Sequence, residues 1–165
     1  EAYVYAARAA TELGKWPELH ELYAKFGKKY PNSLQRPHMD LYEAAALLMD
    51  GHAVESLPML GAISRSDTYQ DVKADALYYL GYHKMTKIQE DYKAAMQFYD
   101  ESIRLYPREL SCVTAARCAI HLRNWTRAEI LLERALRDFP AGKPGALKEA
   151  SRLLPTVMKE LAKLN

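Results

Sequence analysis

The chain has 165 residues, of which 49% are hydrophobic, so it can fold around a sizeable core and differs from a disordered segment. Its 23 basic and 21 acidic side chains are well mixed and leave a net charge of +2, which argues against a nucleic-acid partner. No apolar run reaches the roughly 18 residues that a membrane-spanning helix needs, which argues against direct membrane insertion.

Helical periodicity runs along the chain, and no alternation typical of a strand is sustained. The pattern predicts helices at about residues 2–13, 16–29, 38–50, 53–64, 70–86, 91–105, 109–122, 125–138 and 146–163. Short turns separate the two helices of each pair, at Gly14, Gly51, Glu90-Asp91 and Arg123-Asn124. Helices joined so closely must be antiparallel neighbours, so the predicted fold class is all-α.

Three stretches repeat one another in register, counted back from Pro31, Pro107 and Pro140. An aromatic residue lies 15 positions before each proline (Trp16, Tyr92 and Trp125), and a small or aliphatic residue lies 12 positions before it (Leu19, Ala95 and Ala128). Pro107 and Pro140 are 33 residues apart, a period typical of helical repeat arrays. Stacked helix pairs bury the apolar surface that one pair would leave exposed, so the period predicts a solenoid.

This pattern resembles the tetratricopeptide repeat family over nearly the whole chain. Residues 74–108 carry the matching positions Leu77, Leu80, Gly81, Tyr92, Ala95, Tyr99 and Pro107, and residues 109–142 carry Ala116, Trp125, Ala128, Ala135 and Pro140. Residues 1–33 match through Ala7, Gly14, Trp16, Leu19 and Pro31, with Phe26 where the family prefers alanine. Residues 37–70 depart most, because they keep Ala44 and Gly51 but lack the aromatic residue and the terminal proline.

The resemblance implies a right-handed α-solenoid of about four antiparallel helix pairs, with repeats at about 1–33, 37–70, 74–108 and 109–142. A last helix at about 145–164 resembles the capping helix of such arrays, and Pro155 is expected to kink or divide it. The chain starts inside a helical pattern, so we expect residues 1–165 to be a single domain taken from a larger protein.

In this family the first helix of each repeat lines a concave face, which implies a groove for an extended peptide or an amphipathic helix. The resemblance places eight candidate binding residues there: Arg8, Tyr42, Met49, Tyr78, Tyr82, Met85, Arg117 and His121. It also places Leu41, Ala45, Val113 and Thr114 on that face. Tyrosine and arginine often anchor interfaces, and methionine adapts to irregular partners. The alternative is that some tyrosines belong to the core, because the adjacent Tyr78 and Tyr79 cannot point the same way.

One subtype of the family holds chaperone C-termini by clamping a carboxylate with lysine, asparagine and arginine. The corresponding positions here are Val4, Arg8, Tyr42, Ala45, Tyr78 and Tyr82, so the clamp is absent.

Signals for catalysis and cofactor binding are weak. Asp50, His52 and Glu55 flank a turn glycine, which is typical of solvated turn and capping residues. Cys118 and His121 are three apart on one helical face, but no second ligand pair accompanies them, so neither a metal nor another cofactor is expected. Cys112 and Cys118 are six apart and fall on different faces of one helix, which favours two buried thiols over a disulfide.

The sequence therefore favours a non-enzymatic scaffold that binds a protein or peptide partner. The alternatives are self-association into a homo-oligomer through the N-terminal end, and a regulatory repeat domain of a larger enzyme. Phrases such as Tyr30-Pro31-Asn32-Ser33 look like those of bacterial periplasmic repeat proteins, a group with outer-membrane-assembly lipoproteins and scaffolds of polysaccharide export. This likeness favours a bacterial envelope or secretion assembly, with a cytoplasmic scaffold as the alternative.

Overall fold

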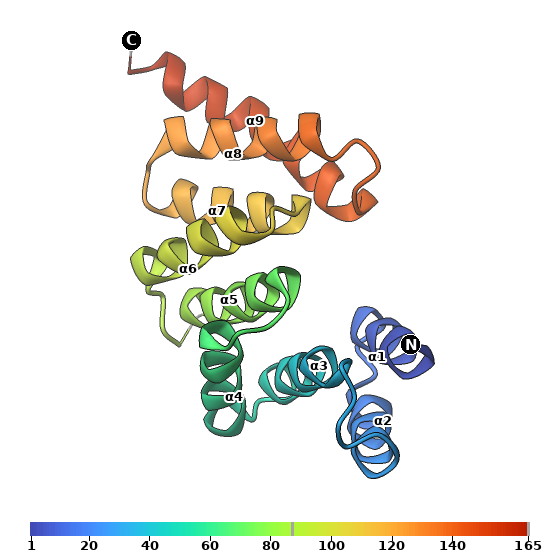
Figure 1. Cartoon of the computed structure of the whole chain (residues 1–165). Coiled ribbons are helices and arrows are strands. Elements are labelled where there is room, and N and C mark those ends of the chain that lie inside the picture. The colour runs from blue at the N-terminus through green and yellow to red at the C-terminus, as the bar shows by residue number, and fades with distance from the viewer. Residues whose placement is uncertain (87, 165) are drawn as a thin grey trace. The chain divides into compact units, whose positions relative to one another are not determined.

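The computed structural model describes residues 1–86 and 88–164, and all regular structure within these ranges is helical. In chain order the helices are α1 (Ala2–Glu12), α2 (Trp16–Lys29), α3 (Arg36–Met49), α4 (Ala53–Arg65), α5 (Gln70–Met85), α6 (Tyr92–Leu105), α7 (Glu109–His121), α8 (Trp125–Asp138) and α9 (Pro144–Ala162) (Figure 1). Adjacent helices pack pairwise, as in an α-solenoid, so the predicted fold class is confirmed.

Two helices continue through an internal proline. Pro58 lies inside α4 and Pro155 lies inside α9. Of the expected kink or division at Pro155, the division does not occur, because α9 continues through the proline. A proline inside a helix removes one N–H donor and leaves a carbonyl without its partner. Both prolines are solvent-exposed, so water can satisfy the freed carbonyl and the helix persists.

The turns inside the helix pairs share one backbone geometry. Four residues adopt the left-handed conformation, with φ of 66° at Gly14, 91° at Gly51, 46° at Glu90 and 56° at Arg123. In three of the turns an N–H donates to the carbonyl five residues earlier, from Lys15 to Ala10 at 2.9 Å, from His52 to Leu47 at 2.7 Å and from Asn124 to Ala119 at 2.8 Å. These bonds satisfy carbonyls that a helix end would leave unpaired. Because they span the same number of residues, they also show which residues of the three pairs occupy equivalent positions.

The turn between α5 and α6 is longer than the other three. Its corresponding bond runs from the Asp91 N–H to the carbonyl of Lys84 at 2.9 Å, and so spans seven residues where the others span five. Lys87, within this turn, lies outside the described residues. The Asp91 carboxylate then accepts the Ala94 N–H at 3.0 Å and caps α6, as the Asn124 side chain caps α8 by accepting the Arg127 N–H at 3.1 Å.

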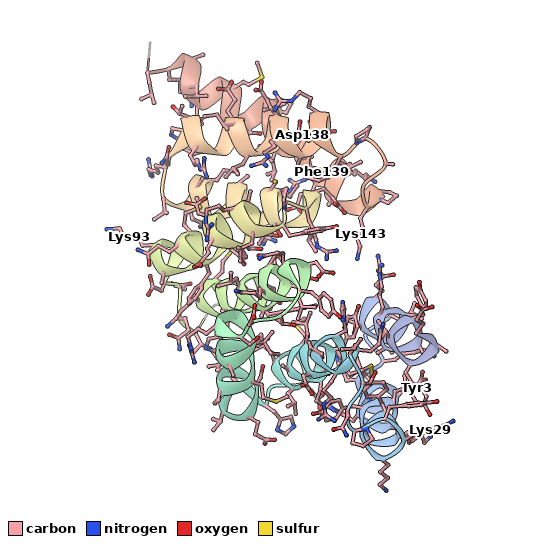
Figure 2. All side chains as sticks on the ribbon, in the orientation of Figure 1. Tyr3, Lys29, Lys93, Asp138, Phe139 and Lys143 are labelled. Atoms are coloured by element: carbon pink, nitrogen blue, oxygen red, sulfur yellow. The ribbon has the colours of Figure 1, made fainter. Side chains whose placement is uncertain are left out.

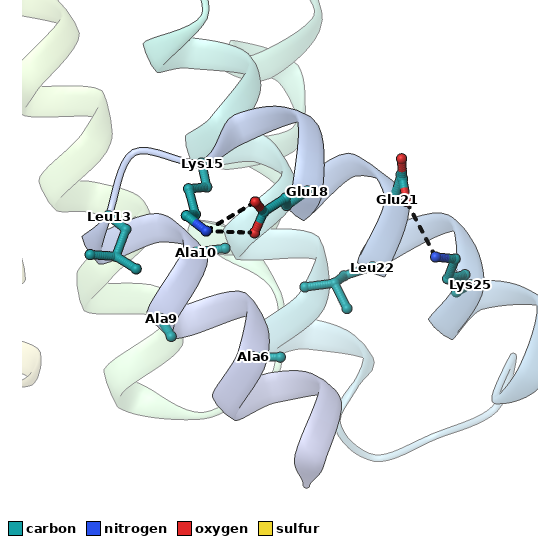
Figure 3. A pocket seen from close by; sticks show the side chains of 9 residues that line it. All are labelled: Ala6, Ala9, Ala10, Leu13, Lys15, Glu18, Glu21, Leu22 and Lys25. Atoms are coloured by element: carbon teal, nitrogen blue, oxygen red, sulfur yellow. Dashed lines mark hydrogen bonds and ion pairs between the residues drawn. The ribbon is translucent and has the colours of Figure 1, made fainter.

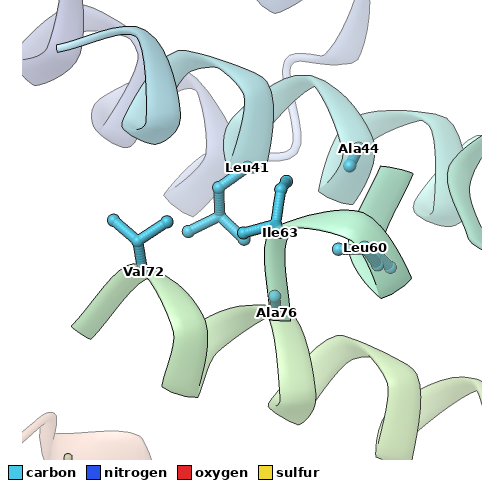
Figure 4. Close-up of a cluster of buried hydrophobic side chains, with 6 residues drawn as sticks. All are labelled: Leu41, Ala44, Leu60, Ile63, Val72 and Ala76. Carbon is cyan, nitrogen blue, oxygen red and sulfur yellow. The ribbon is translucent and has the colours of Figure 1, made fainter. Parts of the chain in front are cut away.

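The chain divides into two compact units, an N-terminal unit (Glu1–Leu80) and a C-terminal unit (Gly81–Asn165). In the N-terminal unit α1 packs on α2 and α3, α2 packs on α3, and α3 packs on α4. One hydrophobic cluster joins α1, α2 and α3 through Ala7, Phe26 and Met39, and a second joins them through Ala10, Leu19 and Ala46. A third cluster joins α3, α4 and the start of α5 through Leu41, Ala44, Leu60, Ile63, Val72 and Ala76 (Figure 4).

The divergent second pair keeps a small residue where α3 and α4 approach each other. Ser56 stands at the position of Leu19, Ala95 and Ala128 in the other pairs and is fully buried. Its hydroxyl donates to the carbonyl of Ala44 at 2.6 Å, so the buried polar group is satisfied. The serine therefore supports close helix packing in a pair that lacks the aromatic residue and the proline.

In the C-terminal unit α6 packs on α7, α7 packs on α8 and α9, and α8 packs on α9. The end of α5 approaches α6 closely, because a Cβ atom at Gly81 would lie 3.0 Å from the Tyr99 ring and 3.2 Å from the Ala95 carbonyl oxygen. The segment before α9 contains Lys143, labelled in Figure 2. Its backbone N–H donates to the Glu109 carboxylate of α7 at 3.0 Å, which ties this segment to α7.

Candidate partner-binding surfaces

Four of the predicted binding residues lie in the N-terminal unit. Arg8 and Met49 are exposed, the methionine to 41%. Tyr42 is half-buried and packs against both clusters that join α1, α2 and α3, so much of its ring belongs to the core. Tyr78 is also half-buried, and its ring lies edge-on to that of Tyr79 with 5.4 Å between centroids. These two tyrosines therefore offer a partner only part of their surface.

Arg8 is held by a neighbour on its own helix. Its Nε atom donates to the Glu12 carboxylate at 3.4 Å, and both side chains are about half exposed, 57% and 45%. An exposed pair of this kind contributes little to stability, so Arg8 can exchange its partner at small cost.

The other four predicted residues lie in the C-terminal unit. Tyr82 and Met85 are half-buried near the end of α5, and the Met85 sulfur accepts the Cys118 thiol at 3.3 Å. Arg117 is exposed, with its Nε atom 3.7 Å from the Glu149 carboxylate of α9. The exposed His121 ring stacks on Tyr92 of α6, with centroids 4.2 Å apart and ring planes 8° from parallel.

Four further residues that the sequence placed on this face are buried. Leu41, Ala45, Val113 and Thr114 are between 0 and 4% exposed, so the prediction that they line a groove is wrong. They face neighbouring helices because the first helices of inner pairs are covered on more than one side. Burial of this kind depends on tertiary packing, which the helical period alone does not specify.

A shallow hollow lies on the outer side of the first helix pair (Figure 3). It has a volume of about 500 Å³, and its lining comes from α1, α2 and the turn between them: Ala6, Ala9, Ala10, Leu13, Lys15, Glu18, Glu21, Leu22 and Lys25. Two ion pairs lie on its rim, Lys15 with Glu18 at 3.0 Å and Lys25 with Glu21 at 3.2 Å. The sequence pattern does not indicate this hollow, because its alanines look like those of the packed positions.

The cluster of Asp50, His52 and Glu55, at the turn between α3 and α4, is open to water. The two nitrogens of the His52 ring lie 3.7 Å from the carboxylates of Asp50 and Glu55, and all three side chains are more than half exposed. Among the described residues no group of His, Cys, Asp or Glu side chains is arranged to hold a metal ion. No helix in the described ranges is long and apolar enough to cross a bilayer.

Both cysteines are free and buried, as the sequence predicts. Burial raises the pKa of the Cys112 thiol to about 11 and that of the Cys118 thiol to about 12. Since the thiolate is the reactive form, these pKa values make both side chains unreactive at neutral pH.

The folded chain should therefore react with a thiol reagent at pH 8 about 100-fold or more slowly than the chain unfolded in urea, because its thiolate fraction is that much lower. An exposed reporter cysteine, Ser151→Cys on α9, should react within the mixing time and serves as the positive control. Rapid reaction of the native wild-type thiols would contradict the burial.

The family model of the tetratricopeptide repeat matches residues 1–33, which are α1, α2 and their connecting turn. The first helix pair is therefore similar to a tetratricopeptide repeat. No curated protein and no solved structure matches the chain. Tetratricopeptide repeats generally mediate protein–protein interactions and typically form non-enzymatic scaffolds, which is the class of function that this match supports.

Proposed function

We propose that the protein is a scaffold that binds a peptide or a helix of a protein partner through the first helices of its repeats. The observation that carries the proposal is the tetratricopeptide match at residues 1–33, together with the aromatic and methionine side chains on the first helices that follow. We further propose repeats at about 37–70, 74–108 and 109–142 and a cap at about 145–164, supported by the shared left-handed turns.

The binding residues are proposed separately for the two units. In the N-terminal unit the exposed Arg8 and Met49 and the half-buried Tyr42 and Tyr78 form the candidate surface. In the C-terminal unit the candidates are Tyr82, Met85, Arg117 and His121. Partly exposed aromatic rings suit this role, because they give large contact area and lose little conformational freedom on binding.

Peptides selected from a random library on the whole chain would test the proposal. Combining Met49→Ser with Tyr78→Ala should weaken a selected peptide about tenfold or more, because two anchors of about 1 kcal/mol each are removed. Binding is measured by fluorescence anisotropy, and circular dichroism checks that the variant folds.

A control variant removes the same two residue types elsewhere. Met158 on α9 and Tyr106 after α6 are exposed to 52% and 46%, and Met158→Ser with Tyr106→Ala should leave the affinity unchanged. If both folded double variants bind the peptide as tightly as the wild type, the proposal that the first helices form the binding surface is contradicted.

We also propose that the scaffold works in a bacterial envelope or secretion assembly. The support is the likeness of 30–33 and 75–81 to periplasmic repeat proteins. Fractionation of cells that produce the tagged natural protein tests this location, and recovery in the cytoplasmic fraction alone would contradict it.

A further inference from the structure

The last helix carries a line of positive charge on its exposed side. Lys148, Arg152 and Lys159 are spaced by four and seven residues, so they lie within about 40° of one another around α9. All three residues are exposed, and the line that they form is about 16 Å long; we call it the α9 cation line. α9 packs on α7 and α8 (Figure 1), and its buried residues lie on the side opposite the line: Ala146, Ala150 and Val157.

The charges of the cation line are not neutralised by neighbouring carboxylates. On other helices a cation commonly pairs with an acid three or four residues away, as Lys15 pairs with Glu18 at 3.0 Å. Lys148 and Lys159 have no acidic residue at these spacings. Within residues 1–86 and 88–164, the ion pairs that α9 forms leave out all three members of the line. A face that is merely solvated needs no such exclusion of acids, so the line favours a partner of opposite charge.

Arg117 of α7 lies beside the cation line. Glu149 follows Lys148 in the sequence and precedes Arg152 by about one turn, and its carboxylate is 3.7 Å from the Nε atom of Arg117. Both side chains of this ion pair are partly exposed, so it is weak and a carboxylate of a partner can take the place of Glu149. His121 is exposed one turn further along α7, and its ring can donate a hydrogen bond to a carboxylate.

The residues around the line do not suit a stacked helix pair. Stacking of repeats buries large apolar side chains, whereas the exposed residues closest to the line between its ends are Pro155 and Thr156. Met158, which is 52% exposed, lies about 100° around the helix from Lys159. A further repeat placed against the line would have to bury cations without a counter-charge, which is costly.

The size of the line indicates the kind of anionic partner. An extended chain of about five residues spans its length, and alternate side chains of such a chain are about 7 Å apart, close to the rise of about 6 Å between Lys148 and Arg152. Nucleic acids and anionic membranes are bound by broader basic surfaces, and the whole chain has a net charge of only +2. A short acidic segment of a protein therefore fits the line best.

We propose that the α9 cation line, together with Arg117, binds an extended acidic segment of the protein partner. Aspartate and glutamate side chains of the segment pair with the three cations of α9, and one of its carboxylates replaces Glu149 at Arg117. The surface extends the C-terminal binding surface under Proposed function, because Arg117 and His121 belong to that surface, and it rests on that function.

A fluorescent peptide of alternating glutamate and serine residues is the probe, and the same peptide with glutamine in place of glutamate is its control. Fluorescence anisotropy should show saturable binding of the probe alone to the whole chain, and added salt should weaken it because the contact is electrostatic. Combining Lys148→Glu, Arg152→Glu and Lys159→Glu should weaken the probe about tenfold or more.

A charge-matched variant controls for the change in net charge. Lys28, Arg65 and Lys93 are exposed and lie on α2, α4 and α6, away from α9 in the sequence. Combining Lys28→Glu, Arg65→Glu and Lys93→Glu alters the net charge by the same amount and should weaken the probe less than about twofold. Circular dichroism and the thermal midpoint establish that both triple variants are folded.

Three results would overturn the proposal. They are absence of probe binding to the folded wild-type chain, equal weakening by the two triple variants, and tighter binding of labelled oligothymidine or phosphatidylserine vesicles through the same cations. The last result would assign the line to a nucleic acid or a membrane.

Library-selected peptides separate failure of this proposal from failure of the scaffold function. If such peptides bind and are weakened by Met49→Ser with Tyr78→Ala while the glutamate–serine probe does not bind, the acidic segment is wrong and the scaffold function stands. If neither the selected peptides nor the probe binds, both are contradicted.

Discussion

Replacing Phe26 by alanine should lower the free energy of unfolding by about 3–4 kcal/mol. The expectation runs against the repeat pattern, since Ser102 and Ala135 occupy the equivalent positions and are fully buried. Substitution toward a repeat's common residue often stabilises a protein. Here the surrounding structure has adapted to the large ring, and alanine would leave a cavity.

The ring of Phe26 is the centre of an aromatic cluster between α1 and α2. It is 3% exposed, and its centroid lies 5.7 Å from the rings of both Tyr3 and Tyr30. It also packs against Ala7 and Met39, so its removal affects the contact of α1 and α2 with α3. Aromatic pairs at such distances add to the stability that burial provides.

Urea unfolding followed by circular dichroism measures the effect. Ile130→Ala, which shortens a 50% exposed residue on α8, is the control and should cost less than 1 kcal/mol. An unchanged or raised midpoint for Phe26→Ala would show that the first pair tolerates the family's small residue.

The sequence predicted the elements that local pattern determines. The helix pairs, their turns and the small residues at helix crossings could be predicted, because each depends on spacing along the chain. The helix predicted at 146–163 includes Pro155, but whether the proline would divide it could not be predicted, since that depends on the solvent exposure of the proline. The packing of Phe26 could not be predicted either. The repeat pattern shows that a large ring stands where alanine is preferred, but it does not show that Tyr3 and Tyr30 pack around that ring.

The candidate binding residues were harder to predict because their role depends on exposure. Arg8 and Met49 are exposed, whereas Leu41 and Ala45 on the same side of their helices are buried. The distinction is set by how closely neighbouring helices approach, and a period of 33 residues does not encode it. The hollow on the first helix pair could not be predicted for the same reason, because it depends on which side chains of α1 and α2 stay exposed.

Tyr99→Ala should be the most destabilising change in the C-terminal unit, lowering the free energy of unfolding by about 3–5 kcal/mol. Tyr99 is the largest fully buried side chain among the described residues, and it packs directly on Gly81. Thermal and urea unfolding of the variant measure the loss, and a shift below 1 kcal/mol would contradict this packing.

The pair of Tyr99 and Gly81 also provides a test of why α5 has glycine where the corresponding positions of α1, α3 and α7 have alanine. Alanine at position 81 would place its Cβ atom 3.0 Å from the Tyr99 ring, so Gly81→Ala alone should cost about 1–2 kcal/mol despite the better helix propensity of alanine. At these two positions the second pair has Ala44 with Leu60 and the fourth has Ala116 with Leu132. The first pair has Ala7 with Tyr23, but that tyrosine is only half-buried, and its hydroxyl donates to Asp40 at 2.9 Å.

Tyr99→Leu should therefore remove the penalty of Gly81→Ala. In that background the glycine substitution should be neutral or stabilising by up to about 1 kcal/mol, which gives a coupling energy of at least about 1 kcal/mol in a double-mutant cycle. Additive effects would mean that the glycine is retained for a reason other than the tyrosine ring. A large coupling would show that the buried ring of Tyr99 is the reason why α5 carries glycine at position 81.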